Sequence, residues 1–109
     1  MRSFGDRTID HGGNTHTYTR LGPYGVVAVI TPWNLPLNQL ARTPAQAVGN
    51  AVILKPSEFT SITSLPLGRL ASEADLPGSV LSVVTGNGAE VGAPLAEHPV
   101  VRRIARQRC

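Results

Sequence analysis

The chain has 109 residues, of which 41% are apolar and 16% charged, a balance typical of one globular domain and unlike that of a disordered chain. The formal net charge of +3 comes from arginines after residue 101, because six basic and seven acidic residues precede them, so we expect no specific nucleic-acid partner. The aliphatic runs are far shorter than the ~20 residues of a membrane helix, and the single cysteine excludes an internal disulfide framework.

The first 20 residues are polar, with their clearest turn at His11-Gly12-Gly13-Asn14, and predict an N-terminal arm. Residues 24–31 are a continuous β-prone apolar run that Pro32 ends. Such a run predicts a strand covered on both faces, as in a parallel sheet. A helix is predicted over residues 36–48, although it contains Pro44, which makes it short or kinked.

The rest of the chain continues this alternation of strands and helices. Further strands are predicted at residues 51–54, 80–84 and 100–105, and further helices at residues 61–74 (containing Pro66) and 88–97. The order β-α-β-α-β-α predicts an α/β fold, a partial Rossmann-like parallel sheet with flanking helices. Because ligands of such sheets bind at the carboxyl ends of the strands, we expect function in the polar clusters there.

Three sequence blocks at these strand ends resemble the aldehyde dehydrogenase superfamily. The blocks are Gly25–Pro36 (GVVAVITPWNLP), Gly49–Glu58 (GNAVILKPSE) and Val83–Gly86 (VVTG), followed by His98-Pro99. The resemblance covers residues 17–105 and implies NAD-dependent oxidation of an aldehyde substrate to a carboxylic acid. In that family a cysteine thiolate attacks the aldehyde, hydride passes to nicotinamide, and a glutamate activates water.

The resemblance assigns a catalytic role to Asn34, whose amide would hold the oxyanion formed on the aldehyde. An alternative is that Asn34 caps the helix that follows. Lys55 and Glu58 would hold the adenosine ribose, and the Glu58 carboxylate implies NAD in preference to NADP because it disfavours a 2′-phosphate. The alternatives are that Lys55 is a surface lysine at a strand end and that Glu58 is an acid in the first turn of a helix, where the helix dipole favours it. The remaining cofactor-binding residues implied are Ile30, Thr31, Pro32, Trp33, Pro56, Ser57 and Gly86.

Trp33 and Gly86 could each have a structural role instead of a cofactor-binding one. Trp33 could pack in the core instead of forming a wall of the cofactor site. The segment Gly86–Gly92 nearly matches a dinucleotide-binding fingerprint, but its last glycine is one residue late, and we interpret it as a strand-to-helix turn. The three histidines lack metal-ligand spacing, so no metal site is expected.

The chain departs from the family pattern in two places. Between Asn34 and Gly49 it is two residues shorter, and Arg42-Thr43 occupies the region where the family usually has a lysine. After Ala105 the resemblance implies a Phe-Thr-Gly-Ser turn at the cofactor pyrophosphate, and residues 106–109 stand in its place. We therefore divide the chain into a polar arm (1–20), a partial NAD-binding domain (21–105) and a divergent basic tail (106–109), with a frameshift or premature stop as the hypothesis for the tail.

The resemblance places the family's nucleophilic cysteine and general-base glutamate downstream of these blocks. We expect Cys109 to be a reactive surface thiol rather than the nucleophile, because no base accompanies it. The chain is thus expected to be a truncated fragment, inactive alone, that binds NAD weakly or not at all. The alternative is a non-catalytic nucleotide-binding or interaction fragment that docks on a full-length relative. Because Met1–Asp10 lacks the apolar core of a signal peptide, we expect a cytoplasmic location.

Overall fold

The computed structural model describes residues 7–10, 12–46 and 48–106. Its centre is a four-stranded sheet in the order β5-β4-β3-β6, and all three pairings in it are parallel. The strands are β3 (Val26–Ile30), β4 (Ala51–Lys55), β5 (Leu81–Val83) and β6 (Val101–Arg106). The helices are α1 (Pro36–Gln46), α2 (Ser61–Glu73) and α3 (Ala93–Glu97), with short helical turns at Glu58–Thr60 (η1) and Gly88–Gly92 (η2). The predicted parallel α/β sheet is confirmed.

The hydrophobic core lies on one face of the two central strands. Val27 and Val29 of β3 are in register with Val52 and Leu54 of β4, and all four side chains are buried. Half-buried apolar side chains of α2, β5 and β6 pack against this cluster: Leu67, Leu81, Val83 and Ala105. The apolar run in β3 is therefore a central strand, with β4 on one side and β6 on the other.

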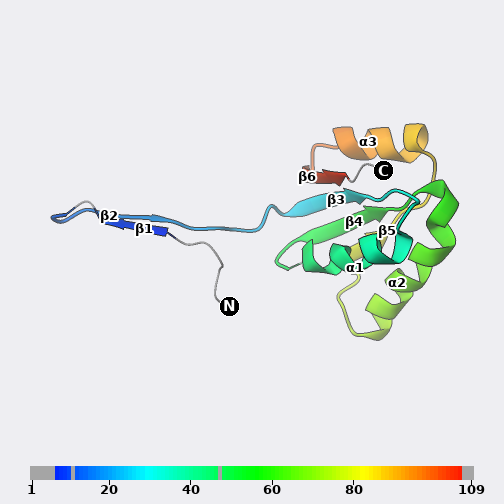
Figure 1. Cartoon of the computed structure of the whole chain (residues 1–109), viewed down its shortest axis with the longest axis horizontal. Helices are drawn as coiled ribbons and strands as arrows, with labels where there is room; N and C mark the ends of the chain where they lie inside the picture. The colour runs from blue at the N-terminus through cyan, green and yellow to red at the C-terminus, as the bar shows by residue number, and fades with distance from the viewer. Residues whose placement is uncertain (1–6, 11, 47, 107–109) are drawn as a thin grey trace.

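The helices cover the two faces of the sheet unequally. Figure 1 shows α1 and α2 on one side of the sheet and α3 on the other, next to β6. Since successive side chains of a strand point to opposite faces, the residues between the core positions point toward the α3 side. They include Ile30, Lys55 and Ile104.

The third predicted helix begins differently from the expectation. Residues 88–92 form a π-helical turn, and the α-helical part, α3, starts only at Ala93. The side chain of Asn87 caps the turn, because its Oδ1 accepts a hydrogen bond from the Glu90 N–H at 2.8 Å. The following strand, β6, includes Arg106 and thus ends one residue later than predicted.

The prolines inside two helices are accommodated without ending them. Pro66 lies in the middle of α2, and the backbone hydrogen bond that its ring removes would have used the carbonyl of Ile62. Pro66 is exposed and Ile62 is 87% exposed, so water can reach that carbonyl. Pro44 lies within α1, an 11-residue helix that ends at Gln46, whereas the prediction extended it to residue 48.

The N-terminal arm contains a hairpin that the sequence did not predict. β1 (Arg7–Asp10) pairs antiparallel with β2 (His16–Thr19) and projects away from the α/β layers (Figure 1). Gly12 and Gly13 adopt positive φ angles of 68° and 85° in the turn between them, which glycine allows without strain. His11 of the predicted turn lies outside the described residues. None of the helices in the described part of the chain is long and apolar enough to cross a membrane.

Replacing Leu54 by alanine tests the core. Leu54 is completely buried, so Leu54→Ala should lower the free energy of unfolding by about 2–5 kcal/mol. Leu70→Ala is the matched control, because Leu70 is 59% exposed on α2 and its loss should cost less than about 0.5 kcal/mol. Urea unfolding followed by far-UV circular dichroism measures both. Equal effects of the two variants would show that the core is placed wrongly.

Candidate functional site at the strand ends

Lys55 is the last residue of β4 and is buried despite its charge. The residue is 3% exposed, and its Nζ donates a hydrogen bond to the Pro56 carbonyl at 3.2 Å and lies 4.0 Å from Glu58 Oε2. A buried ammonium needs such partners because desolvating it alone is costly. The interpretation of Lys55 as a surface lysine is therefore wrong, since the fold holds this cation inside the edge of the sheet.

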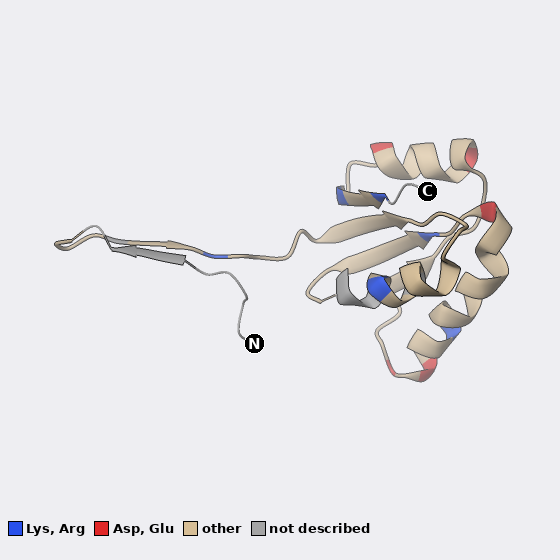
Figure 2. Ribbon diagram, in the orientation of Figure 1, with Lys and Arg blue, Asp and Glu red and all other residues tan. Residues whose placement is uncertain are grey.

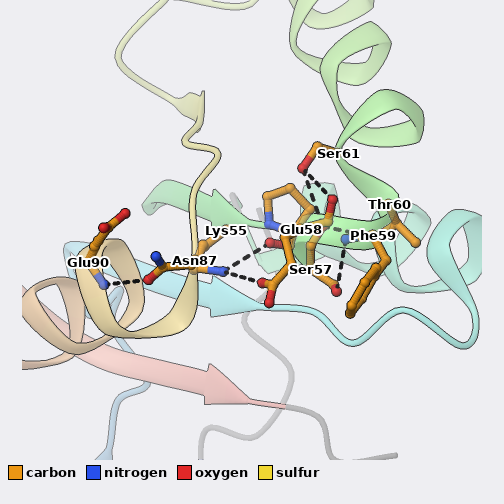
Figure 3. A network of polar contacts seen from close by, with 9 residues as sticks. Lys55, Ser57, Glu58, Phe59, Thr60, Ser61, Asn87 and Glu90 are labelled. Atoms are coloured by element: carbon orange, nitrogen blue, oxygen red, sulfur yellow. Dashed lines mark hydrogen bonds and ion pairs between the residues drawn. The ribbon is translucent and has the colours of Figure 1, made fainter.

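Glu58 is brought to Lys55 by a short turn after the strand (Figure 3). Ser57 caps that turn, because its Oγ accepts a hydrogen bond from the Phe59 N–H, and its carbonyl accepts from the hydroxyls of Thr60 and Ser61. The Glu58 side chain remains 53% exposed, with one carboxylate oxygen toward Lys55. The Lys-Pro-Ser-Glu sequence thus places a carboxylate and an ammonium group together at one strand end.

The loop from β5 into η2 is held tightly by two glycines. Gly86 has a φ of +150°, and a Cβ atom at this position would lie 2.4 Å from Val91 Cγ2. Gly92 is buried, and a Cβ built on it would lie 3.6 Å from the Cδ and Cε atoms of Lys55. Both glycines therefore allow close approach, one between the loop and its own helix, the other between that helix and the Lys55 stem.

These elements line a partly open cavity of about 400 Å³ on the α3 side of the sheet. Its described lining residues are Ile30, Lys55, Gly88, Gly92, Ala93, Ala96, Ile104 and Arg106. Two of them are charged, and both are cations. Figure 2 shows basic positions on β6 and at the end of β4. A cavity with small apolar walls and two cations is chemically suited to a ligand that combines an apolar group with anionic oxygens.

A second cavity, of about 280 Å³, lies on the opposite side of the sheet beside α1. Thr31 lines it together with Gln39 and Arg42 of α1. Thr31 is buried, and its N–H donates to the Lys55 carbonyl at 3.1 Å, which holds the ends of β3 and β4 together. Thr43, in the region where the resemblance expects a lysine, is fully buried, and its hydroxyl donates to the Gln39 carbonyl.

Asn34 lies in the bend between β3 and α1 and is exposed. The capping alternative for Asn34 is wrong, because Leu35 occupies the cap position, its carbonyl accepting the first helical hydrogen bond, from the Gln39 N–H. Trp33 is 58% exposed, so the core-packing alternative is also wrong in this chain. Pro32 is half-buried between the strand and the bend.

The structure thus gathers some of the predicted site residues and separates others. Ile30 and Lys55 line one cavity, Glu58 lies 4.0 Å from Lys55, and Gly86 precedes the helical turn whose Gly92 lies against the Lys55 side chain. Thr31 points to the other face. The cavity-lining positions Gly88, Gly92 and Arg106 were not predicted from the sequence. The four-residue spacing of the two glycines, which puts both on one face of a helical turn, was the available signal.

Comparison with known proteins gives a consistent family. The model of the Aldehyde dehydrogenase family matches residues 1–106. Hydroxyisobutyraldehyde dehydrogenase of Mycolicibacterium austroafricanum is 50% identical over 102 residues, which are 92% of this chain and 20% of that protein. The chain therefore spans about a fifth of the length of the curated relatives it matches.

Solved structures agree with the sequence relatives. A NAD-dependent aldehyde dehydrogenase from Sinorhizobium meliloti is 50% identical with a TM-score of 0.74, covering 78% of this chain and 17% of that one. The NAD⁺ complex of an aldehyde dehydrogenase from Bacillus cereus is 34% identical with a TM-score of 0.84, covering 94% of this chain and 21% of that one. Both structures therefore resemble this chain in sequence as well as in fold.

The close approach at Gly86 predicts a large cost for a single added methyl group. Gly86→Ala should lower the free energy of unfolding by about 1–3 kcal/mol, because the new Cβ collides with the stiff side chain of Val91. Gly88→Ala is the control, since a Cβ there meets nothing within 4 Å, and it should be neutral or slightly stabilising. Urea denaturation of both variants makes the comparison. A harmless Gly86→Ala would contradict the packing described for this loop.

Proposed function

Since this chain belongs to the aldehyde dehydrogenase family, we propose that its strand ends form the ribose-binding and adenosine-binding part of a NAD site in an enzyme that oxidises an aldehyde to a carboxylic acid. The observation that carries the proposal is the Lys55–Glu58 pair at the carboxyl edge of a parallel sheet, beside a preformed cavity. The names of the relatives support the same cofactor and substrate class.

The side chains at this edge fit the chemistry of a ribose. The Glu58 carboxylate is exposed enough to accept hydrogen bonds from two ribose hydroxyls, and the Lys55 ammonium can donate to one of them. A 2′-phosphate next to Glu58 would bring two negative charges together, which favours NAD over NADP. Pro56 and Ser57 would act by fixing the turn that carries Glu58.

The glycines fit the flat base of the cofactor. Gly86 allows its loop to lie against Val91, and Gly88 and Gly92 leave the cavity wall without side chains. A planar apolar group packs best against such a wall. When bound, NAD would supply the hydride acceptor for aldehyde oxidation, with Ile30, Pro32 and Trp33 as wall contacts and Thr31 as a backbone contact.

Asn34 would serve the substrate rather than the cofactor. Its amide is exposed in the bend after β3 and can donate to an oxyanion without changing protonation state. A donor of this kind typically lowers a barrier by about 3–4 kcal/mol. Because the resemblance places the nucleophilic cysteine and the general-base glutamate outside residues 17–105, we propose that these 109 residues alone do not turn over aldehyde. A cytoplasmic location is proposed from the single cysteine of the sequence.

A second candidate is a non-catalytic fragment that docks on a full-length family member. Three large apolar side chains of α1, η1 and α2 favour it, because Leu37, Phe59 and Ile62 are 70%, 82% and 87% exposed. Size-exclusion chromatography of the chain mixed with a full-length relative tests this candidate. A shared peak that Ile62→Glu abolishes is expected if the two associate, and separate elution would contradict it.

Titration with NAD, followed by shifts of backbone amide signals in NMR spectra, tests the cofactor site. We expect weak saturable binding, with a dissociation constant of about 1 mM, that shifts the amides of Ile30, Lys55 and Gly92. Glu58→Gln should weaken NAD binding about tenfold, because charge-assisted hydrogen bonds are lost, and should weaken NADP binding less.

The matched control for this titration is Glu73→Gln. Glu73 is an exposed acid on α2, hydrogen-bonded to Arg69 at 3.0 Å and not among the lining residues of the cavity. This variant should bind NAD as the unaltered chain does. Absence of any shift at millimolar NAD, or shifts confined to the β1–β2 hairpin, would contradict the proposed site.

A further inference from the structure

The pairing of β6 with β3 contains a one-residue irregularity. Val26 is in register with Val101, but the next residue of β3, Val27, is in register with Arg103. Arg102 is therefore an extra residue in β6, as in a β-bulge. Because successive side chains of a strand point to opposite faces, one extra residue exchanges the faces of all the β6 residues that follow it.

The bulge decides which β6 side chain points into the 400 Å³ cavity. With the bulge, Ile104 is in register with Ala28 and lines that cavity. Ala105 is in register with Val29 and packs against the core. In a regular pairing that continued from Val101 without the bulge, Ile104 would be opposite Val29 and would point toward the core, and Ala105 would take the cavity position.

The regular pairing is sterically and energetically accessible. Ile104 is 42% exposed in the bulged pairing, so turning it toward the core would bury more apolar surface. Space for the larger side chain exists, because the 280 Å³ cavity is lined by Val29 and Ala105, at the position that Ile104 would enter. Two registers of β6, which differ by one residue after Val101, are therefore compatible with the same sheet.

Tyr24, just before β3, contacts the arginine that is opposite Val27. The Arg103 Nη1 donates a hydrogen bond to the Tyr24 Oη at 2.8 Å, and the Arg103 Cζ lies 4.8 Å from the centre of the tyrosine ring. This is a cation–π contact combined with a hydrogen bond. In the regular pairing Arg102 would occupy the place opposite Val27, from which it would reach Tyr24 in the same way. The two consecutive arginines thus allow the same contact in each register.

We propose that β6 has two registers on β3 and that the arginine available to Tyr24 selects between them, which makes Tyr24 and Arg103 positioning residues for the wall of the larger cavity. Neither is among the described lining residues of the two cavities, so both act on a ligand only through Ile104. The consequence for ligand binding rests on the proposed function, because it assumes that NAD binds in the 400 Å³ cavity.

Two arginine variants of the 109-residue chain should have opposite effects. Arg103→Gln leaves Tyr24 with Arg102 as its arginine partner, so β6 should shift to the regular register. In NMR spectra of the unbound chain, cross-strand nuclear Overhauser contacts between Val27 and Arg102 should appear, and those between Val27 and position 103 should weaken. NAD binding should weaken about threefold, since the cation–π contact is exposed.

Arg102→Gln is the matched variant, because it also removes one exposed arginine of β6 and changes the net charge by the same amount. It leaves Tyr24 with Arg103, the partner in the bulged register. The contacts between Val27 and Arg103 should therefore persist, and NAD should bind at least as tightly as to the unaltered chain. A loss of positive charge by itself would affect the two variants equally.

A second change at Tyr24 separates the choice of register from a loss of stability. Tyr24→Leu, added to Arg103→Gln, removes the contact that favours the regular register. The bulged pairing and most of the NAD binding should then return. If Arg103 had only a structural role, the double variant would bind NAD no better than Arg103→Gln alone, and this result would overturn the proposal.

The outcomes distinguish this proposal from the proposed function, because the pairing of β6 is measured without NAD. If neither arginine variant changes the contacts of Val27, the proposal of two registers is wrong and the NAD site stands. If the registers shift as expected but the unaltered chain does not bind NAD at millimolar concentration, the proposed function fails and the positioning role fails with it, while the two registers stand. Equal weakening of NAD binding by both arginine variants would overturn the positioning role.

Discussion

The parallel register between β3 and β4 is the constraint on which the rest of the structure depends. Burying Val52 and Leu54 on the α2 side of the sheet forces Lys55, the next residue, toward the α3 side. A slip of one residue would exchange the two faces, exposing the core and pointing the lysine into it. The hydrogen bond from the Thr31 N–H to the Lys55 carbonyl continues this register to the ends of the two strands. The same apolar contacts that stabilise the sheet therefore place the functional cation.

The two faces of the sheet serve different purposes. The α1 and α2 side holds the packed core, whereas the side covered by η2 and α3 is walled by glycine and alanine and remains partly open. A larger side chain at position 92 would fill part of this space. The residue there is a buried glycine, and the methylene groups of Lys55 lie against it. The α3 side of the sheet therefore has less apolar packing than the α1 and α2 side, and it has a concave surface with two cations.

Much of the candidate site was predictable, because its residues come directly after apolar runs that are easily recognised as strands. The apolar runs fixed β3 and β4, and the rule that ligands bind at carboxyl ends pointed to Lys55 and Glu58, which the turn capped by Ser57 brings within 4.0 Å. Arg106 was harder to recognise, because it was grouped with a divergent tail rather than with β6. Its proximity to Ile30 depends on the pairing of β3 with β6, whose paired residues lie about 75 positions apart in the sequence, and no local pattern encodes that pairing.

The sequence by itself determined the alternation of strands and helices, the parallel sheet and the resemblance to a family, because each depends on local periodicity or on short blocks of residues. It left open the capping role of Asn34 and the packing role of Trp33, and the tertiary structure excluded both. Only the tertiary structure decided which face each strand end presents, since that depends on the register with neighbouring strands. For that physical reason Thr31 and Lys55, both predicted for one site, lie on opposite faces of the sheet, while Arg106 joins Lys55.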